Sequence, residues 1–103
     1  MKVINENQYK NEVLNSKGVV VLDFFASWCG PCRMISPELE EMEEETGIPV
    51  FKMDVDECQS VPREYGVMSI PTVCIFKDGK FQEKFLGYRN KDEIKDIIEK
   101  HIK

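Results

Sequence analysis

Apolar and polar positions along the chain predict alternating strands and helices. Short runs rich in β-branched and aromatic residues, typical of strands, occupy residues 3–4, 19–26, 49–55, 72–76 and 81–86. Between these runs, apolar residues recur at intervals of three and four, as on the buried face of a helix. This pattern predicts four helices, over residues 5–16, from the cysteines at 29 and 32 to Gly47, over 60–65 and from Asn90 to about 102.

Capping patterns mark two of the helix starts. Asn5 is followed three residues later by Gln8, and Asn90 is followed in the same way by Glu93. Pro37 falls inside the pattern of the second helix and is expected to kink that helix without ending it. The last helix is expected to bury Ile94, Ile97, Ile98 and Ile102.

The order of these elements predicts an α/β fold. The run 19–26 is apolar at nearly every position, which is typical of a central strand covered on both faces. The second helix joins it to the strand 49–55 as a β-α-β crossover, and Asp78-Gly79 predicts a hairpin between the last two strands. The expected architecture is a three-layer α/β/α sandwich with a mixed sheet. No repeat or linker divides the sequence, so residues 1–103 are expected to form a single domain.

Composition and charge argue against several classes of function. The formal net charge of −5 disfavours a nucleic-acid partner held by bulk electrostatics. The polar start of the chain has no apolar signal region, and no run approaches the ~20 apolar residues of a membrane span. Four cysteines in 103 residues do not make a disulfide scaffold. We therefore expect a cytoplasmic protein with no membrane contact.

Cys29 and Cys32 lie where the central strand turns into a helix. The first turn of a helix has free backbone N–H groups and the positive end of the dipole, and both favour a thiolate, the nucleophilic form of cysteine. We expect Cys29, at the tip of the turn, to be the better-exposed sulfur and the nucleophile, with Cys32 as the resolving thiol. Gly30 and Pro31 keep the turn tight, so the second thiol lies close to the first.

A structural zinc site is the alternative for this cysteine pair. Zinc binds four N or S ligands, and the other candidates are Cys58, Cys74 and His101, none of which forms a second close pair. Cys74 is expected to be a small buried residue of a strand, and Cys58 a partly exposed, inert thiol. His101 is expected to pack or fray near the C-terminus. We therefore expect no metal.

Together with their surroundings, the cysteines make the sequence similar to the thioredoxin family. The matching pieces are residues 23–26, Trp28 to Cys32, 65–67, 70–72 and Gly87. The resemblance implies the thioredoxin fold, with five strands and four helices, and a protein-disulfide reductase that cycles through a Cys29–Cys32 disulfide. It also implies re-reduction by a thioredoxin reductase, disulfide-containing target proteins, no cofactor and a monomeric chain.

Asp23 is unusual as a carboxylate inside an apolar strand. It could be a polar residue at a strand end that reaches water, since burying a charge is unfavourable. The resemblance implies a different role, in which a buried Asp23 below the cysteines exchanges a proton with Cys32. Lys52 matches the lysine that the family places near this carboxylate, so a weak pairing is expected.

A substrate-contact patch is implied by the same resemblance. It would consist of Trp28, Ile70, Pro71 and Gly87, with a cis peptide bond before Pro71. The sequence departs from common family members at Phe25, Arg33 and Ser69. Of these, Ser69 is expected to narrow the substrate groove and alter the choice of partner.

Two other functions remain open. The chain could be a binding module whose thiols only register a partner, or a glutaredoxin-like carrier, although the latter class favours other residues between the cysteines. The acidic run over residues 38–45 is expected to be a solvated face, and a docking surface for a basic partner is the alternative.

Overall fold

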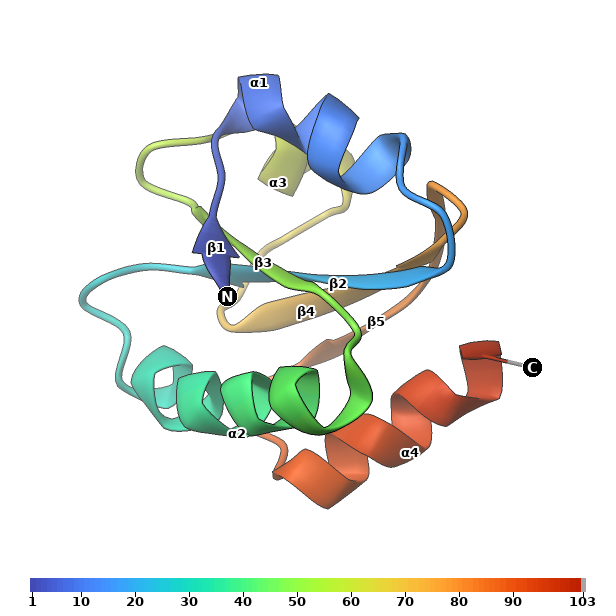
Figure 1. The fold of residues 1–103 in the computed structure, drawn as a ribbon. Coiled ribbons are helices and arrows are strands. Elements are labelled where there is room, and N and C mark those ends of the chain that lie inside the picture. The colour runs from blue at the N-terminus through green and yellow to red at the C-terminus, as the bar shows by residue number, and fades with distance from the viewer. Residues whose placement is uncertain (103) are drawn as a thin grey trace.

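A computed structural model describes residues 1–102, which form one five-stranded sheet with helices on both faces (Figure 1). The strands run in the spatial order β1-β3-β2-β4-β5, and β2 is at the centre, as its apolar sequence predicts. β1, β3 and β2 are parallel, whereas β4 and β5 are antiparallel to their neighbours. Their bounds are β1 (Lys2–Val3), β2 (Val19–Phe25), β3 (Val50–Asp54), β4 (Thr72–Lys77) and β5 (Lys80–Leu86).

The helices form the two outer layers of the predicted sandwich. α1 and α3 cover one face of the sheet, and α2 and α4 cover the other (Figure 1). α1 continues directly into a π-helical segment, η1, which the sequence pattern did not predict; the Asn15 N–H bonds the Lys10 carbonyl there. The bounds are α1 (Glu6–Tyr9), η1 (Lys10–Leu14), α2 (Gly30–Thr46), α3 (Ser60–Glu64) and α4 (Lys91–Ile102).

The side chains of β2 alternate between two hydrophobic cores. Val20, Leu22 and Phe24 pack into the core beneath α1 and α3, and Val21 packs into the core beneath α2 and α4. Successive strand residues point to opposite faces, so Asp23 shares the face of Val21 and points toward the α2 layer. Each fully buried aliphatic or aromatic side chain contributes about 1.5–3 kcal/mol, so these two cores fix the register of β2.

The predicted buried stripe of α2 and the predicted end of this helix at Gly47 are confirmed. Ile35, Leu39 and Met42 are fully buried, and the helix continues through Pro37. Gly47 ends it with a φ of 75°, a left-handed conformation that favours glycine. Both capping boxes form, and a tight turn with positive φ at Asp78 and Gly79 joins β4 to β5.

One prediction for α4 is wrong. Ile94 and Ile98 are buried and Ile97 is partly buried, but 54% of Ile102 is exposed. A helix turns about 100° per residue, so position 101 returns to within about 20° of Ile94, whereas position 102 lies about 80° away. His101 therefore occupies the sheet-facing position, where its ring contacts the Glu83 carboxylate of β5.

The acidic run of α2 does more than face solvent. The Glu43 carboxylate accepts hydrogen bonds from the N-terminal ammonium of Met1 at 2.8 Å and from the Val50 N–H at 2.7 Å. It therefore fastens the C-terminal end of α2 to the start of β3 and to the N-terminus.

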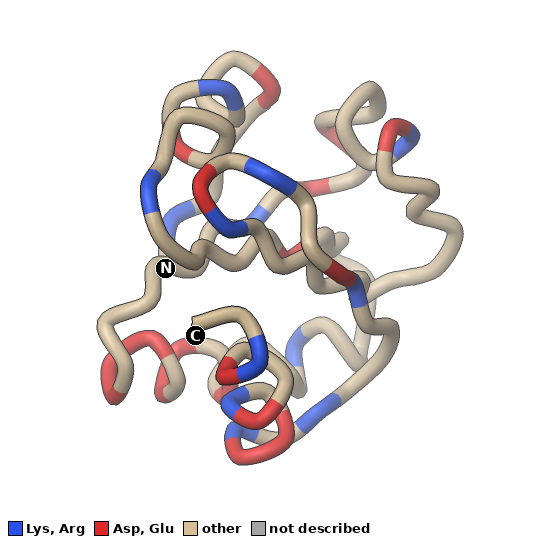
Figure 2. The backbone as a smooth tube through the Cα atoms, turned by 90° about the vertical axis from the view of Figure 1, so that its right-hand side faces the viewer, with Lys and Arg blue, Asp and Glu red and all other residues tan. Residues whose placement is uncertain are grey.

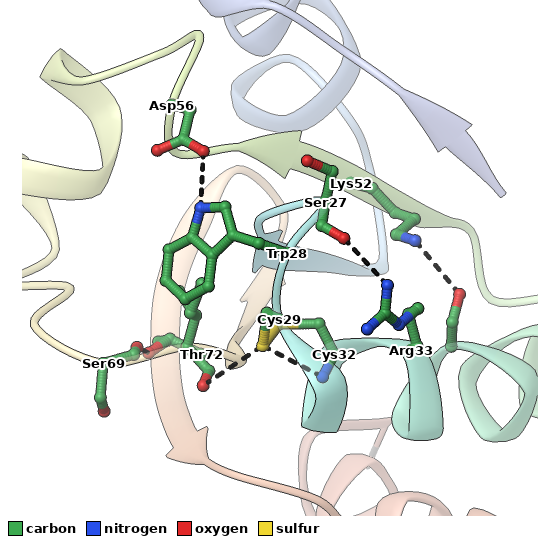
Figure 3. The surroundings of a disulfide bond; sticks show 11 residues. Ser27, Trp28, Cys29, Cys32, Arg33, Lys52, Asp56, Ser69 and Thr72 are labelled. Carbon is green, nitrogen blue, oxygen red and sulfur yellow. Dashed lines mark hydrogen bonds between the residues drawn. A yellow bond between two sulfur atoms is a disulfide. The ribbon is translucent and has the colours of Figure 1, made fainter.

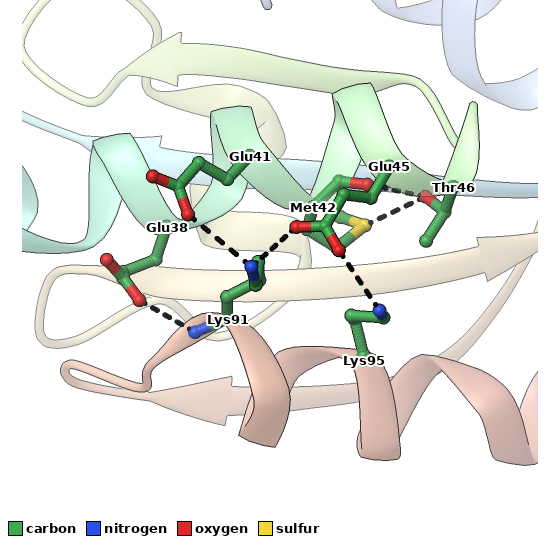
Figure 4. Close-up of polar contacts among 7 residues, drawn as sticks. All are labelled: Glu38, Glu41, Met42, Glu45, Thr46, Lys91 and Lys95. Atoms are coloured by element: carbon green, nitrogen blue, oxygen red, sulfur yellow. Dashed lines mark hydrogen bonds and ion pairs between the residues drawn. The ribbon is translucent and has the colours of Figure 1, made fainter.

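Other glutamates of the run join α2 to α4 (Figure 4). Glu38 accepts a hydrogen bond from the first N–H of α4, that of Lys91, at 2.8 Å. The Lys91 ammonium pairs with Glu45 at 2.6 Å and with Glu41 at 3.7 Å, and Lys95 pairs with Glu45 at 3.4 Å. In the lower half of Figure 2, red acidic segments and blue basic segments lie next to one another below the C-terminus. Glu41 and Glu45 are exposed, as predicted, although they also pair with α4, whereas Glu38 and Glu43 are half-buried, so the prediction of a solvated face is wrong for those two.

Candidate active site

The cysteine pair lies at the junction of β2 and α2 (Figure 3). Cys29 is the N-cap of α2, and Pro31 lies in the first turn, where a missing N–H breaks no helical hydrogen bond. Cys29 and Cys32 form a disulfide, with their Cα atoms 5.3 Å apart. The expected Cys29–Cys32 pairing is thus present in the structure.

The Cys29 sulfur is placed where a negative charge is stabilised. It accepts a hydrogen bond from the Cys32 backbone N–H at 3.2 Å, at the positive end of the 17-residue helix α2. It also lies 3.8 Å from the Ile70 carbonyl oxygen. After reduction, the same N–H and the same dipole favour the Cys29 thiolate over the thiol.

The predicted difference in exposure between the two cysteines is wrong for the oxidised protein. Cys29 is 4% exposed and Cys32 is 3% exposed, because both pack with Ala26 against the half-buried Phe25 and Ile70. Burial therefore does not distinguish the nucleophile from the resolving thiol. Their positions on the helix do, since Cys29 is the N-cap that receives the N–H bond and Cys32 lies within the first turn.

Trp28 is 66% exposed, as its place in the turn predicts. Its indole N–H donates a hydrogen bond to the Asp56 carboxylate at 2.9 Å, and Figure 3 shows the ring standing beside the disulfide. Asp56 follows β3 and was not predicted as part of the site, because nothing in the local pattern indicates which loop meets Trp28.

The segment before β4 approaches the same place. The Ile70–Pro71 peptide bond is cis, as the resemblance implied. Pro71 is buried, and its carbonyl accepts a hydrogen bond from the Gly87 N–H at 2.9 Å. Of the predicted patch, the structure places Trp28 and Ile70 at an open groove, whereas Pro71 and Gly87 lie outside its lining.

This groove, which we call the α3 groove, has a volume of about 550 Å³. It begins between Trp28 and Ile70 and runs along α3, and Ser69, one of the departures from the family pattern, is part of its wall. The lining residues are Trp28, Val55, Gln59, Pro62, Arg63, Val67, Met68, Ser69 and Ile70.

Asp23 is fully buried, and neither of its carboxylate oxygens accepts a hydrogen bond from any residue in 1–102. Burial raises the pKa of Asp23 to about 7, because removal from water disfavours the charged form; the Lys52 ammonium opposes this shift. A carboxyl group with that pKa exchanges protons readily near neutral pH. The alternative of a solvated residue at a strand end is therefore wrong.

Lys52 is the direct neighbour of Asp23 across the β2–β3 ladder. Its ammonium nevertheless donates a hydrogen bond to the Ser36 hydroxyl at 3.1 Å and lies 4.4 Å from the centre of the Phe25 ring. Within residues 1–102 it makes no ion pair with Asp23, so its influence on the carboxyl pKa acts at longer range. Lys52, Ser36 and Cys32 line a cavity of about 310 Å³ on this side of the disulfide.

The other two cysteines are buried in the core beneath α1 and α3. Cys74 is fully buried, as predicted, and burial raises the pKa of its thiol to about 12. The prediction of a partly exposed Cys58 is wrong: it is 5% exposed, and burial raises the pKa of its thiol as well.

Residues 1–102 contain no cluster of three His, Cys, Asp or Glu side chains arranged to hold a metal ion. None of their helices has the length and apolar character needed to cross a membrane.

These pKa shifts predict selective thiol chemistry. In the reduced native protein at neutral pH, an alkylating reagent should modify the active-site pair, while Cys58 and Cys74 should react only after denaturation, since a buried thiol with a raised pKa supplies almost no thiolate. Peptide mapping by mass spectrometry measures this. A Cys58–Cys74 bridge formed under mild oxidant would contradict the prediction.

Comparison with known proteins agrees with this geometry. Residues 1–100 match the family model described as Thioredoxin. A thioredoxin of Listeria monocytogenes is 47% identical over 104 residues, covering 99% of both chains, and one of Bacillus subtilis is 41% identical, covering 99% of this chain and 100% of the other. The solved structure of a mutant thioredoxin from Halobacterium salinarum superimposes with a TM-score of 0.91 at 38% identity, covering 100% of this chain and 90% of that one. The chain therefore belongs to the thioredoxin family, and its Cys29–Cys32 pair makes it a thiol–disulfide oxidoreductase.

Proposed function

We propose that the chain reduces disulfides in other proteins, with Cys29 as the nucleophile. The observation that supports this assignment is the hydrogen bond from the Cys32 N–H to the Cys29 sulfur at the N-terminus of α2. The Cys29 thiolate attacks one sulfur of the target disulfide. A mixed disulfide forms, and the second target sulfur leaves as a thiolate.

Cys32 then resolves the mixed disulfide. Its thiol loses a proton, and its sulfur attacks the Cys29 sulfur, which releases the remaining target thiolate and forms the Cys29–Cys32 disulfide. The target gains two electrons and the chain loses two. We propose that Asp23 accepts the Cys32 proton, because its carboxyl is buried on the α2 side of β2 and has a pKa of about 7.

The cycle requires an electron donor that reduces the Cys29–Cys32 disulfide again. We propose a thioredoxin reductase in this role and a reducing, cytoplasmic compartment, since a disulfide reductase works only where its own dithiol is kept reduced. Target proteins would dock as extended segments against Trp28 and the Ile70–Pro71 strand entry, with the chain acting as a monomer and a single domain.

Turnover separates this function from that of a binding module. With dithiothreitol as electron donor, the protein is expected to accelerate insulin reduction at concentrations far below that of the donor, because each molecule cycles many times. The rate of insulin B-chain precipitation measures this, and protein alkylated at the active site is the control. A protein that only binds a partner would leave the rate at the level of dithiothreitol alone.

A further inference from the structure

The α3 groove has an apolar lining with a single charged residue among those described. Its lining is mostly apolar, and Met68, which is 96% exposed, stands on its rim. Among the described lining residues, Arg63 carries the only charged side chain. A substrate segment that follows this groove away from the disulfide therefore passes apolar surface and meets one guanidinium.

The Arg63 guanidinium has no partner among residues 1–102. The other two arginines are engaged: Arg33 donates to the Ser27 carbonyl at 3.3 Å, and Arg89 donates to two backbone carbonyls at and just after the end of β5, at 3.1 and 3.2 Å. The neighbouring Glu64 lies beside the Tyr65 hydroxyl and does not line the groove. Arg63 is exposed at the end of α3, so its five N–H donors remain available.

The two ends of the groove differ in charge. At the Trp28 end, the Asp56 carboxylate accepts a hydrogen bond from the indole N–H at 2.9 Å. Its negative charge would repel a carboxylate of the substrate segment at this end. At the α3 end, the Arg63 guanidinium, which has no partner in the described part of the chain, would attract a carboxylate. Planar guanidinium and carboxylate groups form paired hydrogen bonds, a geometry that a lysine in the same place would not reproduce.

We propose that the α3 groove prefers target segments with an acidic side chain that reaches Arg63. This inference rests on the proposed function, since it concerns the substrates of the same disulfide exchange. Arg63 contributes to specificity and takes no part in the exchange of sulfur bonds.

A peptide series tests the proposal. Each extended peptide carries one cysteine as a mixed disulfide with nitrothiobenzoate, and a single Glu is moved through successive positions on both sides, with Gln peptides as matched controls. Release of the coloured thiol by the reduced protein gives a second-order rate constant. For one placement of Glu we expect a rate about two- to fivefold above that of the Gln peptide, the range of a single exposed ion pair, and a smaller ratio at high salt.

Variants assign the preference to Arg63. Arg63→Gln should remove the preference for Glu, Arg63→Lys should keep part of it, and Arg63→Glu should reverse it toward a Lys peptide. Lys17→Gln is the matched control, because it removes the same charge at an exposed position that precedes β2, at the far end of that strand from the disulfide, and it should keep the preference.

The possible failures are distinguishable. If the reduced wild type reacts with no peptide faster than dithiothreitol does, the proposed function fails. If it reacts rapidly but equally with Glu and Gln peptides at every position, only the role of Arg63 is overturned. If Lys17→Gln also loses the preference for Glu peptides, the effect comes from the net charge of the protein, and the role of Arg63 is overturned as well.

Discussion

Cys29→Ser is expected to abolish protein-disulfide reduction, whereas Cys32→Ser should attack once and accumulate mixed disulfides. A serine hydroxyl is not ionised near neutral pH, so the first variant has no nucleophile and its rate should fall to that of the free donor. The second keeps the N-cap sulfur but lacks the neighbouring thiol that resolves the intermediate. Non-reducing gels and mass spectrometry of the trapped species measure both outcomes.

The matched pair of variants also decides the order of attack. The two sulfurs are equally buried in the oxidised protein, so the prediction depends on the hydrogen bond from the Cys32 N–H to the Cys29 sulfur. Circular dichroism and thermal melts check that both variants remain folded. Equal trapping by the two variants would show that the helix N-terminus does not select Cys29.

Asp23→Asn is expected to stabilise the protein much more near pH 8 than near pH 4. Burial raises the pKa of Asp23 from 3.8 to about 7, so folding then favours the protonated form. Below the unfolded pKa both states are protonated and the raised pKa is without effect on stability. Between pH 4 and pH 7 the buried carboxyl therefore lowers the free energy of unfolding as the pH rises, and above pH 7 the effect levels off. Each unit between the unfolded and folded pKa values is worth about 1.4 kcal/mol, so the total loss is at most roughly 4 kcal/mol.

Denaturant melts of both proteins at the two pH values measure this difference. Asp96→Asn is the control, since it removes the same charge from an exposed position on α4 and should shift stability by only tenths of a kcal/mol, with little dependence on pH. An equal effect of Asp23→Asn at both pH values would mean that the carboxyl is hydrated in the folded protein.

The same substitution should slow the exchange reaction. Asparagine cannot accept the Cys32 proton, so release of target from the mixed disulfide should become slower near pH 7, where the Asp23 carboxyl is about half ionised. Single-turnover kinetics separate this second step from the first attack by Cys29. An unchanged rate of release, with the expected gain in stability, would limit Asp23 to a structural effect.

Local pattern was sufficient for most of the fold. Burial in a strand repeats every second residue and burial in a helix every 3.6, so the apolar positions of β2 and α2 indicate both the element and its buried face. The capping residues Asn5 and Asn90 act within one helical turn, and they too are recognisable from neighbouring residues alone. The same holds for the cysteine pair, whose short spacing places both sulfurs at one helix start.

The order of elements, the redox pair and the anomaly of a carboxylate within an apolar strand were therefore all encoded locally. Tertiary contacts were needed to establish that both cysteines are buried, that Trp28 is held by Asp56, that Cys58 is inside the core and that Arg63 faces the α3 groove without a partner among residues 1–102. The difference between the two groups is one of range. The exposure, ion pairing and pKa of a side chain depend on which distant segments exclude water from it. Those contacts form only when the chain folds around the sheet, and the local pattern of apolar residues does not encode them.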